Sequence, residues 1–340
     1  MTGTNRAWVF MQRPLGDDFD SALQFRELPM PEPAEAEVLI RTLYLSLDPA
    51  NRRWMAGPTY MPPVPVGAPM WGYMTGRVVK SNSSQFAVGD LVSGLGWWAD
   101  YSTAPASTLA PVTDSDGLSL ADSIGLLRGA GGTAYVGVLD VGQLKAGETF
   151  VVSGAAGSVG SLAGQIAKIA GADKVIGIAG SAEKCAWLTN ELGFDHAIDY
   201  RRENVQERLA QLCPKGVDVY FENVGGAVGN AVAANMAKGG RIAVCGMVAQ
   251  YNEESASIGL DLMPIVLNGC TVRGYTLFEF LDRLPAISTK LAEWHASGKL
   301  KQHTDIVEGL ENALTGFKQL FTPGSPHKGK MLVRVDAGAR

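Results

Sequence analysis

The sequence predicts an α/β protein in which a mainly β amino-terminal half precedes a doubly wound parallel sheet. Up to about Pro111, short β-forming runs are separated by Pro, Gly and Asp turn signals, as is typical of a small β-barrel or sandwich. Beyond about Ala121, strand and helix signals alternate. Strand-like runs such as residues 175–179 lack a polar face, as expected of strands that helices cover on both sides.

In the amino-terminal half, the predicted strands are residues 6–10, 37–44, 71–80 and 90–95. Residues 121–142 mix apolar side chains with Gly and Ala, which predicts closely packed helix. The following strands are expected at residues 149–153, 174–179, 197–200, 217–224, 241–245 and 271–277, with helices beginning at Ser158, Ala182, Asn204 and Val228.

After the parallel sheet, residues 280–297 have a helical pattern that Pro285 interrupts, and residues 304–307 and 330–335 return to strand character. The last two strands lack a place in the parallel sheet, so we expect them to join the amino-terminal β structure. The chain is 340 residues long, which fits two domains. We expect one domain from residues 1–122 together with 300–340, and a second from residues 123–299.

Composition excludes several classes of protein. Apolar residues make up 46% of the chain and no long run of one charge occurs, so neither a disordered nor a fibrous protein is expected. A net charge of −5 offers no positive field to neutralise nucleic-acid phosphates. No stretch is long and apolar enough for a membrane span, and no leader pattern is visible. We therefore expect a cytoplasmic protein, without nucleic acid or membrane as a partner.

The glycine-rich turn after the first predicted strand of the parallel sheet is the strongest functional signal. Residues 153–160 read SGAAGSVG, which has the GxGxxG spacing with Ala155 in the first glycine position. Gly157 lets the backbone approach a pyrophosphate, and Gly160 lets helix and strand pack closely. The preceding strand, following helix and next strand supply the context that this weak motif needs. The alternative is a glycine turn used only for packing.

The end of the second parallel strand predicts which dinucleotide binds. A site for NAD carries Asp or Glu about 20 residues after the glycines, whereas this chain has Gly180, Ser181 and Lys184 there. A carboxylate would repel a 2′-phosphate and Lys184 would attract it. Tyr200 ends the next strand, so we expect it to close on the same phosphate. The sequence therefore favours NADP(H), unless these side chains are ordinary solvated groups.

The catalytic zinc of alcohol dehydrogenases needs Cys, His or carboxylate ligands from the β domain, yet no Cys or His precedes Cys185. The sequence also lacks a Tyr-x-x-x-Lys pair near the end of the sheet. We therefore expect no metal. Hydride addition to a carbon–carbon double bond conjugated to a carbonyl needs less activation, because charge collects on the carbonyl oxygen as an enolate that hydroxyl donors can stabilise. Tyrosine phenols are the first candidates for those donors.

Several segments together resemble the zinc-independent medium-chain dehydrogenase/reductases, and among them the NADPH-dependent enone (alkenal) double-bond reductases, which include leukotriene and prostaglandin reductases and bacterial curcumin reductase. The resemblance runs from Arg6 to Val335. It is carried by YLSLDP at 44–49, GQLKAGET at 142–149, residues 157–170, AEKC at 182–185, CPKGVD at 213–218, YFENVGG at 220–226, and residues 245–252.

The resemblance implies a GroES-like β-rich catalytic domain and a Rossmann domain that binds NADP(H). It also implies reduction of the α,β double bond of hydrophobic enones or enals. The implied catalytic residues are Tyr251 and Tyr60. The implied cofactor-binding residues are Thr133, Ala155, Gly157, Ser158, Val159, Gly160, Gly180, Ser181, Lys184, Tyr200, Asn223, Cys245, Gly246, Tyr251, Tyr275 and Leu277. For Tyr60 and Tyr251, the alternative is an aromatic ring that only lines a wall or fills the core.

The chain departs from the family pattern beside the expected substrate. Ala50 and Asn51 stand where the family usually has Tyr and Met, residues 129–131 read GAG where it has Met-Pro-Gly, and His327 replaces a usual Asn. Two other activities stay open: NADPH-dependent quinone reduction, and NADPH binding without catalysis. The resemblance also implies a homodimer, in which residues 271–277 would form an edge strand that pairs across the two copies. The alternative is a monomer.

Overall fold

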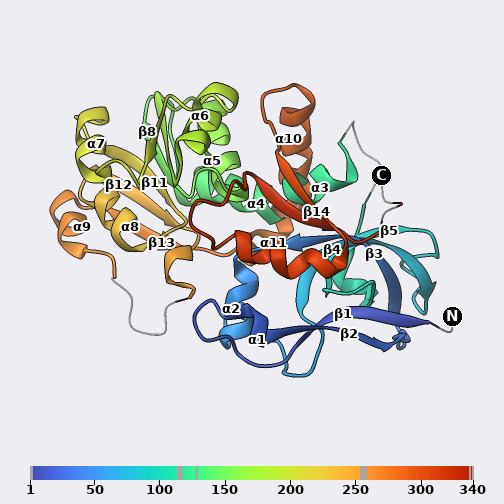
Figure 1. Cartoon of the computed structure of the whole chain (residues 1–340). Coiled ribbons are helices and arrows are strands. Elements are labelled where there is room, and N and C mark those ends of the chain that lie inside the picture. The colour runs from blue at the N-terminus through green and yellow to red at the C-terminus, as the bar shows by residue number, and fades with distance from the viewer. Residues whose placement is uncertain (1–2, 113–117, 128, 253–258, 337, 339–340) are drawn as a thin grey trace. The chain divides into compact units, whose positions relative to one another are not determined.

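The computed structural model describes residues 3–112, 118–127, 129–252, 259–336 and 338 (Figure 1). The chain forms two compact units. The first comprises Met1–Ile124, Thr304–Ser325 and Met331–Arg340, and the second comprises Gly125–His303 and Pro326–Lys330.

The first unit is built on a seven-stranded sheet with the order β14-β15-β3-β4-β5-β7, in which β6 also pairs with β3. These strands are β3 (Glu37–Leu47), β4 (Trp71–Ser81), β5 (Leu91–Trp97), β6 (Tyr101–Pro105), β7 (Ala110–Pro111), β14 (Thr304–Glu308) and β15 (Lys330–Arg334). The antiparallel register sets Met331 opposite Leu47. The expectation that the last two strands join the amino-terminal β structure is therefore confirmed.

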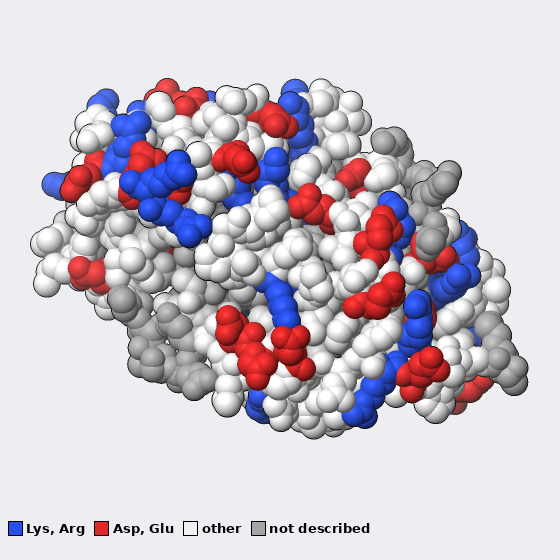
Figure 2. Space-filling view, viewed as in Figure 1, with Lys and Arg blue, Asp and Glu red and all other residues white. Residues whose placement is uncertain are grey.

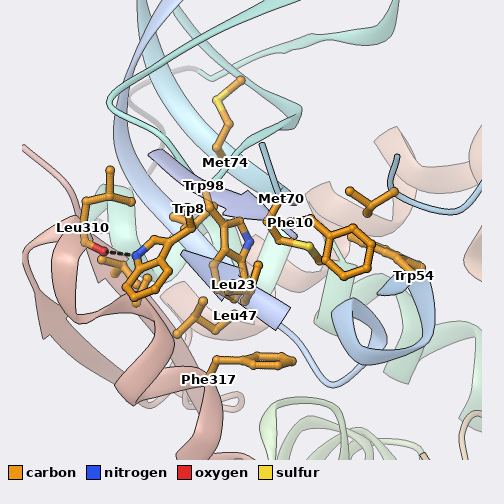
Figure 3. Packing of buried hydrophobic residues seen from close by; sticks show 14 of the residues in the cluster. Trp8, Phe10, Leu23, Leu47, Trp54, Met70, Met74, Trp98, Leu310 and Phe317 are labelled. Atoms are coloured by element: carbon orange, nitrogen blue, oxygen red, sulfur yellow. Dashed lines mark hydrogen bonds between the residues drawn. The ribbon is translucent and has the colours of Figure 1, made fainter. Parts of the chain in front are cut away.

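A separate antiparallel pair and short helices complete this unit. They are β1 (Thr4–Phe10), β2 (Leu23–Pro29), α1 (Phe19–Ala22), α2 (Ala50–Ala56), η1 (Ala106–Thr108), η5 (Leu310–Asn312) and α11 (Ala313–Gln319). The core beneath them contains Trp8, Trp54 and Trp98 (Figure 3). Trp8 Nε1 donates a hydrogen bond to the Leu310 carbonyl at 2.8 Å, which ties the first strand to the carboxyl-terminal segment.

The second unit is a six-stranded parallel sheet with the order β10-β9-β8-β11-β12-β13. Its strands are β8 (Thr149–Ser153), β9 (Lys174–Ala179), β10 (His196–Asp199), β11 (Val217–Glu222), β12 (Met236–Val244) and β13 (Thr271–Gly274). The chain moves outward from β8 to β10 and then restarts at β11 on the other side of β8. Ligands of such sheets bind at this reversal, beyond the carboxyl ends of the strands.

Helices connect and flank these strands (Figure 1). They are α4 (Gly129–Val136), the π-helical turn η2 (Gly137–Val141), α5 (Ser158–Ile169), α6 (Ala182–Glu191), α7 (Val205–Leu212), α8 (Gly226–Ala233), η3 (Val248–Gln250), α9 (Leu262–Asn268), η4 (Leu277–Arg283) and α10 (Leu284–Ala296). Helix α3 (Leu120–Leu127) belongs mainly to the first unit, which continues to Ile124. Pro285 lies in the first turn of α10, where a missing N–H costs nothing. The helical stretch is divided here, where η4 ends at Arg283 and α10 begins at Leu284, so the predicted interruption near Pro285 is present.

Acidic and basic side chains are interspersed over the face shown in Figure 2. No helix within the described ranges is both long and apolar enough to cross a membrane.

Candidate functional site

The glycine-rich turn links β8 to α5 at the carboxyl edge of the parallel sheet. Gly154 has a positive φ of 58°, and the Ala155 N–H donates to the Ile178 carbonyl at 3.0 Å, which fixes the turn to β9. Gly157 is the amino-terminal cap of α5. The first N–H groups of a helix have no partner within the helix, and together with the partial positive charge of a helix start they favour an anion here.

Steric space at the turn explains two of its glycines. A Cβ at Gly160 would lie 2.4 Å from the Gly154 carbonyl oxygen, and one at Gly157 would lie 3.3 Å from the same oxygen. Between them, the Ser158 hydroxyl is buried and has no hydrogen-bond partner within the described part of the chain. A backbone cradle and an unsatisfied hydroxyl at a helix start are what a dinucleotide pyrophosphate requires, so these residues fit the predicted cofactor.

A segment that sequence analysis did not connect with the site lies against the turn. The Gly329 N–H donates to the Ala156 carbonyl at 2.8 Å, and Gly329 forms an isolated parallel bridge with Gly157. Gly329 has a φ of 65°, and a Cβ there would lie 2.2 Å from the His303 carbonyl oxygen. The glycine was the only local signal. These contacts show that the segment around residue 329 lies against the glycine-rich turn within the second unit.

The residues predicted to hold the 2′-phosphate come together after β9 and β10. The Tyr200 ring lies beside Gly180, where a Cβ would be 3.0 Å from the ring, and Tyr200 is 46% exposed. Ser181 caps α6 and accepts a hydrogen bond from the Lys184 N–H at 3.2 Å. No carboxylate occupies residues 179–181. The structure thus gathers a glycine, a hydroxyl, a lysine and a phenol at the end of the second strand.

The loops after β11 and β12 are joined by one buried acid that sequence analysis missed. Glu222 is 5% exposed, and its Oε1 accepts the Ser153 hydroxyl at 2.7 Å, the Val224 N–H at 2.7 Å and the Gly225 N–H at 2.9 Å. The Glu222 carbonyl accepts the Cys245 N–H at 2.9 Å. A carboxylate directly after the run Val219–Phe221 was the available signal.

The predicted residues of these two loops lie next to each other. The Asn223 side-chain amide donates to the Ser153 carbonyl at 2.8 Å, and the Asn223 backbone carbonyl accepts the Val248 N–H at 3.0 Å. A Cβ at Gly246 would lie 3.0 Å from the Tyr251 hydroxyl. The structure therefore brings Asn223, Gly246 and Tyr251 together at the edge that carries the glycine turn.

Tyr275 and Thr133 are joined by a hydrogen bond within the unit. Tyr275 is 7% exposed, and its hydroxyl donates to the Thr133 carbonyl at 3.0 Å. Leu277 packs near Gly132, where a Cβ would be 3.2 Å away. Burial raises the pKa of the Cys245 thiol to about 11, although its hydrogen bond with Tyr275 lowers it. Tyr275 and Leu277 therefore lie against α4, which contains Thr133 and Gly132.

In the first unit, Tyr60 lies in the segment after α2 and is 53% exposed. Its hydroxyl accepts a hydrogen bond from Trp54 Nε1 at 3.3 Å. The Trp54 and Tyr73 rings meet edge to face, with centroids 6.0 Å apart. Burial, with smaller effects of Tyr60 and Asp48, raises the pKa of Tyr73 to about 12.

Potential metal ligands are scattered. Among the described residues, no three His, Cys, Asp or Glu side chains are grouped so that they could hold a metal ion.

Comparisons with known proteins agree with this architecture. Residues 6–112 match the family model described as the N-terminal domain of oxidoreductase, and residues 158–293 match that described as zinc-binding dehydrogenase. The chain is 38% identical over 338 residues to the NADPH-dependent curcumin reductase of Escherichia coli (strain K12), covering 97% of each. It is 38% identical over 314 residues to the 2-alkenal reductase (NADP(+)-dependent) of Nicotiana tabacum, covering 91% of this chain and 90% of the relative.

A solved structure is also similar. The crystal structure of CurA in complex with NADPH from Vibrio vulnificus superimposes with a TM-score of 0.90 at 36% identity, covering 97% of this chain and 99% of the other. The chain therefore belongs to the medium-chain dehydrogenase/reductases, in their enone-reductase group.

Proposed function

We propose that this protein is an NADPH-dependent reductase of the α,β carbon–carbon double bond of enones and enals. The observation that carries the proposal is the pairing of a glycine-turn cradle with a second-strand end that has no carboxylate at residues 179–181, with Lys184 after it and Tyr200 beside Gly180. Relatives named as an NADPH-dependent curcumin reductase and a 2-alkenal reductase support the same chemistry.

The second unit is the proposed cofactor domain. Gly157, Ser158 and Gly160 would receive the pyrophosphate, with Ala155 and Val159 shaping the turn. The 2′-phosphate would meet Lys184, Tyr200, Gly180 and Ser181. Asn223, Cys245, Gly246 and Tyr251 would continue along the dinucleotide, and Thr133, Tyr275 and Leu277 would support its nicotinamide end. When bound, NADPH supplies the hydride for the β-carbon of the substrate.

The first unit is the proposed substrate domain. Tyr60 is proposed to donate a hydrogen bond to the carbonyl oxygen of the substrate as it becomes an enolate. Tyr251, which belongs to the second unit, is proposed as the other catalytic tyrosine. A phenol suits this role because its ordinary pKa of about 10 keeps it protonated at neutral pH, while it still donates strongly to an oxyanion. Replacing Tyr251 with Phe should then lower kcat more than NADPH affinity.

The decisive experiment compares NADPH oxidation with an aliphatic enone and with a benzoquinone, and identifies the products by mass spectrometry. Enone-dependent oxidation that yields the saturated ketone supports the proposal. Oxidation with the quinone alone would favour quinone reduction. NADPH binding without consumption across both acceptors would leave a non-catalytic binding protein.

We also propose a homodimer formed through β13. In the described part of the sheet, β13 borders only β12, and all four of its residues are exposed. Helix α9 exposes a neighbouring apolar set: Leu262 63%, Met263 62%, Val266 73% and Leu267 71%. An exposed edge strand beside an apolar patch favours pairing with another chain.

We propose the cytoplasm as the location of the protein, because its four free cysteines favour a reducing compartment.

A further inference from the structure

An indole N–H meets the oxygen of the tyrosine proposed to act on the substrate. Trp54 is 1% exposed and belongs to the core of the first unit, whereas Tyr60 is 53% exposed. The Trp54 Nε1 donates to the Tyr60 hydroxyl oxygen at 3.3 Å. A side chain fixed in the core therefore holds the reactive atom of a side chain that reaches solvent.

The direction of this hydrogen bond has a chemical consequence. An indole nitrogen only donates, so the Tyr60 oxygen must be the acceptor and its own hydrogen must point to another acceptor. A phenol oxygen that accepts a hydrogen bond carries negative charge more easily, because the donor stabilises that charge. The phenol then donates more strongly through its own O–H group.

We propose that Trp54 is a positioning residue for Tyr60: its N–H orients the phenol and supports the charge that builds on the phenol oxygen while Tyr60 donates to the enolate oxygen. This inference rests on the proposed role of Tyr60. In the overall reaction the β-carbon gains a hydride and the double-bond electrons move to the carbonyl oxygen. A solvent proton on the α-carbon then restores the carbonyl, so atoms and charge balance.

The surroundings of Trp54 fit this role. The Tyr73 ring packs against the Trp54 ring edge to face at 70°, which restricts rotation of the indole. The Ser46 hydroxyl donates a hydrogen bond to Asp48 Oδ2, so the Asp48 carboxylate has a hydrogen-bond partner of its own. Because the pKa of Tyr73 is about 12, Tyr73 stays protonated and adds no negative charge beside Tyr60 at neutral pH.

The test is a double-mutant cycle with a matched control. Trp54→Phe and Tyr60→Phe should each lower kcat about tenfold, with the KM for NADPH unchanged, and the double variant should be no slower than Tyr60→Phe alone. The control is Trp98→Phe. Trp98 lies in the same core (Figure 3) and is 0% exposed, yet its Nε1 has no hydrogen-bond partner among the described residues. This variant should retain kcat within twofold.

Two further measurements separate the hydrogen bond from packing. In the NMR spectrum, the Trp54 indole proton should shift upfield in Tyr60→Phe, while the Trp98 indole proton stays in place. If Trp54→Phe does not fold, benzothienylalanine at position 54, introduced by suppression, removes the N–H and keeps the ring size. It should reproduce the tenfold loss of kcat.

The outcomes are distinguishable. Wild-type kcat in Tyr60→Phe would overturn the proposed role of Tyr60 itself. Suppose instead that Tyr60→Phe lowers kcat about tenfold, and that Trp54→Phe lowers kcat by the same factor whether residue 60 is Tyr or Phe. This result would overturn only the inference about Trp54. An unmoved indole resonance, or full kcat with benzothienylalanine, would do the same.

Discussion

Lys184 is the residue at which charge should decide between the two nicotinamide cofactors. It lies in the first turn of α6, whose cap is Ser181, and the neighbouring Gly180 lies beside the Tyr200 ring. Lys184→Ala should weaken NADPH binding by about 1.5 to 3 kcal/mol, because a charge-assisted contact with the 2′-phosphate is lost. The affinity for NADH, which lacks that phosphate, should stay unchanged. Fluorescence titration with both cofactors checks this.

A matched control exists at the opposite edge of the sheet. Lys215 is an exposed lysine that precedes β11, so it lies at the amino edge of the strands, whereas Lys184 follows the carboxyl end of β9. Lys215→Ala should alter neither affinity. If Lys184→Ala weakens the binding of NADPH and NADH equally, the lysine supports α6 and does not bind the 2′-phosphate.

Two half-buried thiols are held in their protonated form. Burial is the largest cause that raises the pKa of both Cys185 and Cys245 to about 11. A thiolate adds to the β-carbon of an enone and a neutral thiol does not, so at neutral pH these thiols should react about a hundredfold more slowly than ordinary cysteines. Incubation with an enone without NADPH should leave activity intact at pH 7.5. Alkylation mapped by mass spectrometry should then rise about tenfold per pH unit; rapid modification of Cys245 at pH 7.5 would contradict this.

At the scale of elements, Glu222 couples the loops after β8, β11 and β12. Glu222→Ala would leave the Val224 and Gly225 N–H groups without their acceptor in a buried place. We expect a loss of about 2 to 4 kcal/mol in the free energy of unfolding, together with weaker NADPH binding.

Glu222→Gln is the conservative comparison, because its amide oxygen can still accept both N–H groups. It should recover most of the stability and the affinity. Urea unfolding and cofactor titration measure the two effects separately. If NADPH affinity is normal in Glu222→Ala while stability falls, the carboxylate supports the fold without shaping the cofactor loops.

Helices and strands with a strong local pattern could be predicted from the sequence, whereas contacts between residues far apart in the chain could not. The helix start at Ser158 and the strand Lys174–Ala179 follow from glycine spacing and an unbroken apolar run, and the structure has both. By contrast, the bridge between Gly329 and Gly157 joins residues 172 positions apart, and the glycine at 329 gave no indication of its partner. The role of Glu222 was hidden for the same reason: its partners come from three strands.

For the whole molecule, oligomeric state depends on the edge at β13 and α9. Val266 and Leu267 are more than 70% exposed, which is costly for apolar side chains unless a partner covers them. In a dimer, Val266→Asp together with Leu267→Asp would bury unpaired carboxylates. We expect the dimer Kd to rise at least about 30-fold.

Sedimentation velocity and the concentration dependence of Tm measure the equilibrium between monomer and dimer. Tm rises with protein concentration only when folding is linked to association. The wild type should sediment at twice 36.0 kDa, and the double variant at the chain mass. Leu15→Asp is the control, because Leu15 is 73% exposed but lies in the first unit; it should remain dimeric. A wild type that sediments as a monomer at micromolar concentration would mean that these side chains tolerate solvent, and that the edge of β13 is protected by its short length alone.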